Sequence, residues 1–174
     1  MHDDRVDRTT HGSGCIRDLT LEQLRSLKTR SGEAIPTLTD ILRAVSGRAG
    51  LMIDIKVRGI IRDVIAAIAT APHLPVFYAS FFHAELLEVR RLQPAANTIA
   101  LIDAVPVSHT AFAIEAAANY AGIALDSLVP DFVASLKEAK IRVFTYTVDE
   151  PADIAFAHSL PIDGLISNFP DRLR

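Results

Sequence analysis

The 174-residue sequence lacks the features that identify disulfide-bonded, membrane-spanning and nucleic-acid-binding proteins. Its single cysteine, Cys15, cannot form an internal disulfide, so the fold needs no oxidising compartment. Tryptophan is absent, and no apolar run reaches the roughly 18 residues of a membrane-spanning helix. The formal net charge is −3, and no basic stripe indicates a nucleic-acid partner. The first residues lack the apolar stretch of a signal peptide, so we expect a cytoplasmic chain.

The composition is that of a folded protein. Hydrophobic residues make up 49% and charged residues 22% of the chain. These proportions exclude a disordered or fibrous protein. The length predicts one domain that spans residues 1–174.

Strand and helix patterns alternate from residue 51 onward. Short apolar strands are predicted at 51–56, 76–81, 98–102, 122–125, 141–147 and 164–167, and helices at 60–70, 84–92, 110–120, 131–140 and 151–158. Two further helices are predicted earlier, after the capping residues Thr20 and Thr37. Residues 1–18 are polar, and we expect them to form a disordered tail. The alternation indicates a parallel sheet covered by helices, either an open doubly wound sheet or a (β/α)₈ barrel. No glycine-rich phosphate turn follows a strand, which favours the barrel.

In both architectures the functional site lies at the C-terminal ends of the strands. Asp54 and Lys56 are two residues apart there, so their side chains point to the same face. A carboxylate and an ammonium in this place suit an anionic substrate held by a metal, but the spacing alone favours a plain ion pair, since paired charges are often structural. His2 stands beside two aspartates, a spacing too common to indicate a metal site by itself. The other histidines are expected on the solvated surface: His11, His73, His83, His109 and His158.

Several segments together resemble the glycerophosphodiester phosphodiesterases. Residues 2–14 (HDDRVDRTTHGSG) are similar to the family's "HD…ldRtT.G.G", and residues 52–56 (MIDIK) to "l.iEiK". Residues 19–24, 35–38 and 80–81 are similar to "lTleeL", "iPtL" and "SF". Residues 146–149 (YTVD) stand where the family carries "WTVN", and residues 163–170 (DGLISNFP) resemble "vDGiiTD.P". Each block is weak alone, but the blocks occur in the family's order along nearly the whole chain.

The resemblance implies a TIM-type (β/α)₈ barrel that hydrolyses small-molecule glycerophosphodiesters to an alcohol and glycerol 3-phosphate. It implies two histidines acting as general acid and base beside a divalent cation, Mg²⁺ or Ca²⁺, held by carboxylates. Carried over residue by residue, it assigns His2 as catalytic, Asp54 as a metal ligand, and Lys56 and Tyr146 as substrate-binding residues. Asp54 stands where the family has Glu, Tyr146 where it has Trp, and Asn168 where it has Asp.

The family's first motifs, a strand ending in "HRG" and a strand carrying "E.D", have no counterpart here. We therefore expect an incomplete barrel, from a translation start placed too late or from a true truncation. An in-frame "HRG…E.D" in the upstream nucleotide sequence would support the first explanation. One catalytic histidine and two metal carboxylates are then missing, so we expect a weak or absent metal site and impaired hydrolysis. The alternative is an inactive remnant barrel that binds a phosphate or a partner. Unpaired sheet edges also predict self-association.

Overall fold

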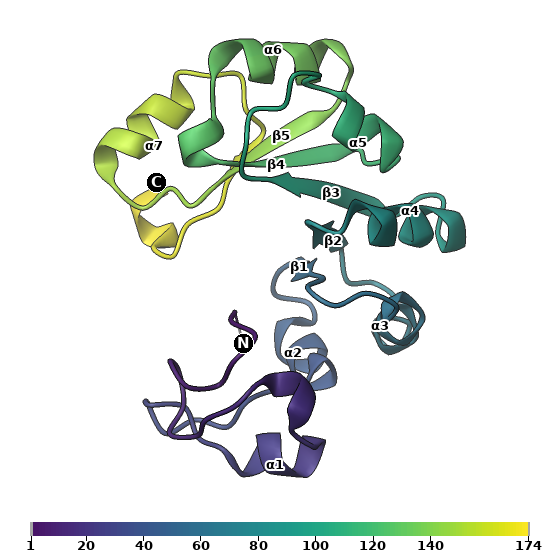
Figure 1. The fold of residues 1–174 in the computed structure, drawn as a ribbon, viewed down its shortest axis with the longest axis vertical. Helices are drawn as coiled ribbons and strands as arrows, with labels where there is room; N and C mark the ends of the chain where they lie inside the picture. The colour runs from purple at the N-terminus through teal and green to yellow at the C-terminus, as the bar shows by residue number, and fades with distance from the viewer. Residues whose placement is uncertain (1, 174) are drawn as a thin grey trace.

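The computed structural model describes residues 2–173 and contains one parallel sheet with helices packed against it (Figure 1). The strands are β1 (Leu51–Asp54), β2 (Val76–Ser80), β3 (Asn97–Ile102), β4 (Tyr120–Ala124), β5 (Arg142–Tyr146) and β6 (Gly164–Leu165). The α-helices are α1 (Leu21–Ser26), α2 (Leu38–Val45), α3 (Ile61–Ile68), α4 (His83–Leu92), α5 (Ala111–Glu115), α6 (Pro130–Glu138) and α7 (Pro151–His158). Three short 3₁₀ turns cover Ile16–Asp18, Leu125–Ser127 and Pro170–Leu173.

The strands follow one another in the sheet in the order β1-β2-β3-β4-β5-β6, and every pair is parallel. Each neighbour is therefore reached through a helical crossover, as the alternating sequence pattern predicts. The sheet is curled, and β1 and β6 stand at its two ends (Figure 1). The predicted parallel, helix-covered sheet is confirmed. Within residues 2–173 it has six strands, so these residues form a curled part-barrel and not a closed eight-stranded one.

Both faces of the sheet are packed, which explains why its central strands read as continuous apolar runs. The convex face packs against the helices, where Phe132, Leu86 and Leu136 are fully buried. The concave face carries a smaller cluster centred on Ala79, Ile99, Leu101 and Tyr120, with Phe77, Phe144 and Tyr146 packed against it. Ring centroids of Phe77 and Tyr120 lie 5.3 Å apart, as do those of Tyr120 and Phe144. The interior of the curl is thus filled by aromatic side chains and is not a pore.

The predicted helix at 110–120 is shorter in the structure, where α5 ends at Glu115 and Tyr120 begins β4. The alanine-rich sequence favours a helix, but Ala117 adopts a left-handed conformation with φ 50° that ends it. Tyr120 buries its ring against Phe77 and Phe144 on the concave face. Tertiary packing of this aromatic ring therefore overrides helix propensity.

The prediction of a disordered tail at residues 1–18 is wrong for the described residues 2–18. Val6 is fully buried and Thr10 is 1% exposed. The Thr10 hydroxyl donates to the Val6 carbonyl at 2.8 Å, and Arg5 forms an isolated antiparallel bridge with Cys15. Backbone hydrogen bonds also tie the segment to residues 28–30, from the His11 N–H to the Lys28 carbonyl at 3.3 Å and from the Arg30 N–H to the Thr9 carbonyl at 3.0 Å. One buried valine is too weak a hydrophobic signal in the sequence to predict this order.

Candidate active site

Asp54 is the last residue of β1, and Lys56 follows it at the C-terminal end of the sheet. The Lys56 ammonium lies 3.4 Å from Asp54 Oδ2, and the two side chains are 32% and 31% exposed. The strand alternation that placed both side chains on one side is confirmed. Both side chains are partly exposed, so a ligand can reach them.

The N-terminal segment reaches the same place. Lys56 Nζ donates a 2.8 Å hydrogen bond to the His2 carbonyl oxygen. His2, Asp3 and Asp4 line a cavity of about 660 Å³ together with Asp54 and Lys56. The structure therefore brings together three of the predicted site residues, His2, Asp54 and Lys56, from segments about fifty residues apart in the sequence.

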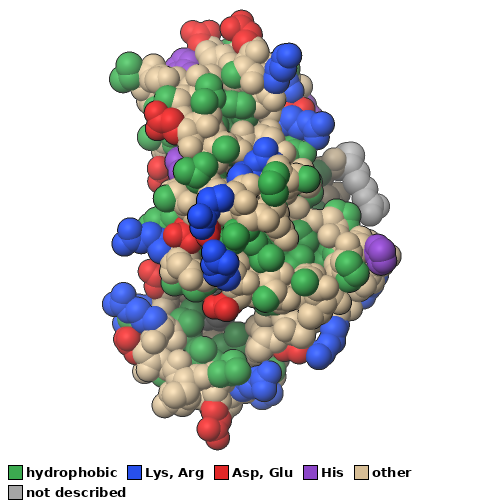
Figure 2. All heavy atoms as spheres, turned by 90° about the vertical axis from the view of Figure 1, so that its right-hand side faces the viewer, with side chains coloured by type: hydrophobic (Ala, Val, Ile, Leu, Met, Phe, Trp, Pro, Cys, Tyr) green, Lys and Arg blue, Asp and Glu red, His purple; other side chains and the backbone are tan. Residues whose placement is uncertain are grey.

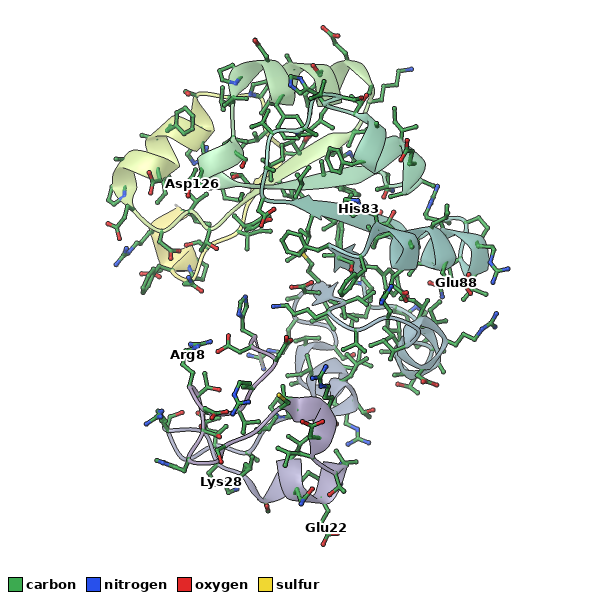
Figure 3. All side chains as sticks on the ribbon, in the orientation of Figure 1. Arg8, Glu22, Lys28, His83, Glu88 and Asp126 are labelled. Carbon is green, nitrogen blue, oxygen red and sulfur yellow. The ribbon has the colours of Figure 1, made fainter. Side chains whose placement is uncertain are left out.

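The carboxylate of Asp3, next to His2, is already paired within the segment. The His2 ring nitrogen Nδ1 lies 3.0 Å from Asp3 Oδ1, and the His2 side chain is 80% exposed. Arg8 donates to both oxygens of Asp3 from Nε and Nη2, at 2.6 and 2.9 Å. The hydrogen bonds from Arg8 and then from His2 hold the pKa of Asp3 well below its usual range. Figure 3 shows Arg8 on this N-terminal segment.

These residues do not fit a resident divalent cation. A hard cation takes six or more oxygen ligands, supplied mainly by carboxylates, carbonyls and water. The Asp54 carboxylate pairs with Lys56, and the Asp3 carboxylate is occupied by Arg8. Among residues 2–173, no three His, Cys, Asp or Glu side chains lie close enough together to hold a metal ion. We therefore derive no chemical step through a metal for this set of residues.

Ser80 fixes the backbone between Asp54 and Lys56. The Ser80 side chain is fully buried, and its hydroxyl donates to the Ile55 carbonyl at 2.6 Å. The Ser80 hydroxyl oxygen in turn accepts a hydrogen bond from the Phe82 backbone N–H at 2.9 Å. One buried hydroxyl thus ties the end of β2 to the end of β1, at the residue between the two charged site residues. This is the structural role of the serine in the "SF" pair.

Tyr146 lies at the same end of the concave face. Its ring packs edge-to-face against Phe81, with centroids 6.3 Å apart, and its hydroxyl donates to the Ile102 carbonyl at 2.9 Å. Burial raises the pKa of the Tyr146 phenol, and the negative charges of Asp103 and Asp54 raise it further. Tyr146 is therefore a neutral aromatic wall whose hydroxyl is already bonded. Substrate binding by this residue stays a prediction.

The loops after β5 and β6 are held together by Asp149. Its carboxylate accepts from the Ser167 hydroxyl and from the backbone and side-chain N–H groups of Asn168, at 2.8–2.9 Å. Hydrogen bonds from Asn168 hold the pKa of Asp149 below its usual range. The family motifs carry Asn and Asp at these two positions, so the carboxylate and the amide have exchanged places in this chain. In this chain the two residues bind each other directly.

The prediction that the remaining histidines are solvated is wrong for His83 and His109. Both are half-buried. His83 Nε2 lies 2.8 Å from the Leu101 carbonyl, and its ring packs on Phe112 at the start of α4 (Figure 3). His109 Nδ1 lies 3.1 Å from the Ser135 hydroxyl, and its ring packs on Phe132. Aromatic neighbours from later helices bury these rings, and the local sequence carries no signal of that packing.

Sequence reasoning missed two residues that line the cavity, Arg58 and Phe82. The Arg58 guanidinium carbon lies 5.7 Å from the centroid of the Phe82 ring. Arg58 follows Lys56 by two residues, and Phe82 follows the "SF" pair directly. Their place after neighbouring parallel strands was the available signal, because the loops after such strands meet at one end of the sheet.

Comparison with known proteins decides the family. The model of the glycerophosphoryl diester phosphodiesterase family matches residues 1–172. The chain belongs to this family. A Bacillus subtilis (strain 168) protein, YhdW, is 29% identical over 186 residues, which cover 98% of this chain and 76% of the relative. A glycerophosphodiester phosphodiesterase of Caldanaerobacter subterraneus is 27% identical over 188 residues, which cover 99% of this chain and 77% of the relative.

Solved structures show the same fold. An Oleispira antarctica phosphodiesterase, determined in complex with its product sn-glycerol-3-phosphate, superposes with a TM-score of 0.92 at 22% identity. The match covers 99% of this chain and 76% of that one. A family structure from Silicibacter pomeroyi matches with a TM-score of 0.88 at 20% identity, over 99% of this chain and 76% of that chain. At these identities the likeness establishes the fold alone.

Proposed function

We propose that this chain binds the phosphate group of glycerophosphodiesters at the C-terminal end of β1, with Lys56 as the main charge partner. The observation that carries the proposal is the meeting of Lys56, Asp54 and His2 at one cavity, at the end of the sheet where barrel enzymes place their sites. The activity named for relatives and the glycerol 3-phosphate bound in a similarly folded structure support the choice of ligand.

The hydrolysis would add water to phosphorus and break the bond between phosphorus and the alcohol oxygen. The products are glycerol 3-phosphate and the alcohol, which takes up a proton. Lys56 would offset negative charge on the phosphoryl oxygens. His2 would serve as one proton-transfer group. Reaction at a useful rate needs a second such group and further charge stabilisation, and residues 2–173 offer no carboxylate cluster that would hold a metal.

We therefore propose that the 174-residue chain by itself binds the phosphate group of the substrate and of the product. It hydrolyses the glycerophosphodiester substrate poorly or not at all. His2 supports this, because its 80% exposed side chain is not held to the roughly 0.5 Å precision that catalysis requires. The test is a coupled assay of glycerol 3-phosphate release from glycerophosphocholine, with Mg²⁺ or Ca²⁺ and with a chelator. We expect no turnover above the uncatalysed background. Clear metal-dependent turnover would overturn the impairment.

Asp54 provides a second test that separates a metal ligand from an ion-pair partner. If Asp54 acts only on Lys56, Asp54→Asn frees the ammonium and removes repulsion of an anionic phosphate. Affinity for glycerol 3-phosphate, measured by calorimetry in chelator, should then rise several-fold. A fall in affinity that appears only when Mg²⁺ or Ca²⁺ is added would instead identify Asp54 as a metal ligand.

The second candidate is a binding module without catalysis, and the pairing of Asp54 and Asp3 with Lys56 and Arg8 favours it.

We also propose that the chain self-associates, because β1 and β6 end the sheet without pairing with each other. Light scattering after size-exclusion chromatography should show species larger than 18.9 kDa. A monodisperse monomer over a wide concentration range would refute the self-association.

A further inference from the structure

Large apolar side chains are exposed in the loops that follow the strands. Val107 is fully exposed, and Val57 is 57% and Phe82 42% exposed. Together with three further exposed residues they form what we call the mouth patch: Val57, Phe81, Phe82, Val105, Val107 and Phe169. These residues come from the loops after β1, β2, β3 and β6. Soluble monomers seldom gather so many large apolar side chains at one end without an interaction to explain them.

The mouth patch lies at the same end of the sheet as Asp54 and Lys56. All six strands are parallel, so the loops after them leave the sheet at the same end. Val57 and Phe82 line the cavity that also contains Asp54 and Lys56. Figure 2 shows the face seen from the right of Figure 1, where acidic, basic and apolar side chains are interspersed. Two residues of the mouth patch, Val57 and Phe82, therefore border the proposed phosphate site directly.

Two phenylalanine rings of the mouth patch each lie close to the guanidinium group of an arginine. The Arg58 guanidinium carbon lies 5.7 Å from the Phe82 centroid, and that of Arg172 lies 4.0 Å from the Phe169 centroid. An arginine beside an exposed aromatic ring suits the boundary between water and lipid, because the ring enters the acyl region while the guanidinium stays with phosphate groups. This pairing distinguishes the patch from a purely apolar protein-binding face.

We propose that the mouth patch docks the chain on a zwitterionic phospholipid surface, with the phosphate site turned toward the headgroups. Among the described residues no helix is long and apolar enough to cross a membrane, so the contact would be peripheral. The net charge of −3 opposes long-range attraction to an anionic membrane. Arg172 is already engaged by Glu150 at 3.6 Å and by the Asp149 carbonyl, so Arg58 is the arginine available to a lipid phosphate. Insertion of apolar side chains and a contact between Arg58 and phosphate would therefore provide the binding, and phosphatidylcholine is the lipid that matches both.

The test uses the absence of tryptophan from the chain. Val107→Trp places a single reporter in the mouth patch, and Leu87→Trp places one at a 49% exposed apolar position on α4. Phosphatidylcholine vesicles should shift the emission of the Val107→Trp protein to the blue, and brominated acyl chains should quench it. The emission of the Leu87→Trp protein should not change. Equal responses of both reporters, or none in either, would overturn the proposal.

Charge substitutions provide the second measurement. Val107→Asp and Val57→Asp should each lower the vesicle partition coefficient at least tenfold in co-sedimentation, while Leu87→Asp should leave it unchanged. Val107 and Val57 are exposed, so circular dichroism should show all three variants folded. A loss of the same size in Leu87→Asp would refute docking through the mouth patch. Vesicle binding requires no turnover and no soluble ligand, so its failure is distinguishable from failure of the proposed phosphate site.

Discussion

Replacing Ser80 with alanine tests how the sheet positions the site. The Ser80 hydroxyl makes two buried hydrogen bonds, to the Ile55 carbonyl and from the Phe82 N–H. A net contribution of about 1 kcal/mol for each bond, and the cost of leaving buried groups unpaired, give a destabilisation of about 2–3 kcal/mol. For a chain of this length that corresponds to a fall in Tm of about 4–12 °C.

The Ser80→Ala substitution should also weaken ligand binding at the site. Because Ile55 lies between Asp54 and Lys56, releasing its carbonyl loosens both side chains, and affinity for glycerol 3-phosphate should fall several-fold. Urea unfolding and calorimetry measure the two effects. Thr145→Val is the matched control, since the buried Thr145 hydroxyl ties β5 to the Ile123 carbonyl at 3.0 Å in the same way. It should lower stability by about 1 kcal/mol without changing affinity. Unchanged stability in Ser80→Ala, or lost stability with unchanged affinity, would refute the positioning role.

Two further predictions concern the fold. Asp163 accepts from Lys137 and from the Val143 N–H. Partial burial raises the pKa of Asp163, but these two donors outweigh it and hold the pKa below its usual range. The resulting stability is present above the unfolded pKa and lost as pH falls through the folded one, so Asp163→Asn should destabilise the protein at pH 7 and match wild type in strong acid. A pH-independent difference between the unfolding curves would contradict this. Val6→Ala should cost about 1–3 kcal/mol in urea unfolding if the N-terminal segment is ordered, and a change below about 0.5 kcal/mol would indicate that it is not.

Most of the fold could be predicted from the sequence, because the signals are local. Each of the six strands was predicted within a few residues, since short apolar runs bounded by proline, glycine and polar residues are typical of a parallel sheet. The capping box at Thr20 is present as predicted, and Thr37 caps its helix as predicted, through a capping box with Asp40. The errors fall where contacts distant in sequence decide the structure. Tyr120 joins β4 because its ring packs on Phe77 and Phe144, and the N-terminal segment is ordered around one buried valine.

The candidate site could be predicted only in part. Strand alternation placed Asp54 and Lys56 together, and motif order placed His2 with them. The pairing of Asp3 with Arg8 and the lining of the cavity by Phe82 depend on how loops fold against one another. Asp149 and Asn168 stand where the family motifs carry Asn and Asp. The hydrogen bond from Asn168 to Asp149 joins loops about twenty residues apart in the sequence and could not be predicted from the motifs.

The central claim is that Lys56 binds the phosphate of a glycerol phosphate at the C-terminal end of β1. The most direct measurement is calorimetric titration of sn-glycerol 3-phosphate into the wild type, Lys56→Met and Arg62→Met, all in chelator. Arg62 is the control because it is an exposed cation on α3 that pairs with Glu88, outside the cavity lining. We expect saturable binding by the wild type and by Arg62→Met, and affinity at least tenfold weaker in Lys56→Met. Equal affinity of Lys56→Met and the wild type, or loss of binding in Arg62→Met alone, would contradict the account.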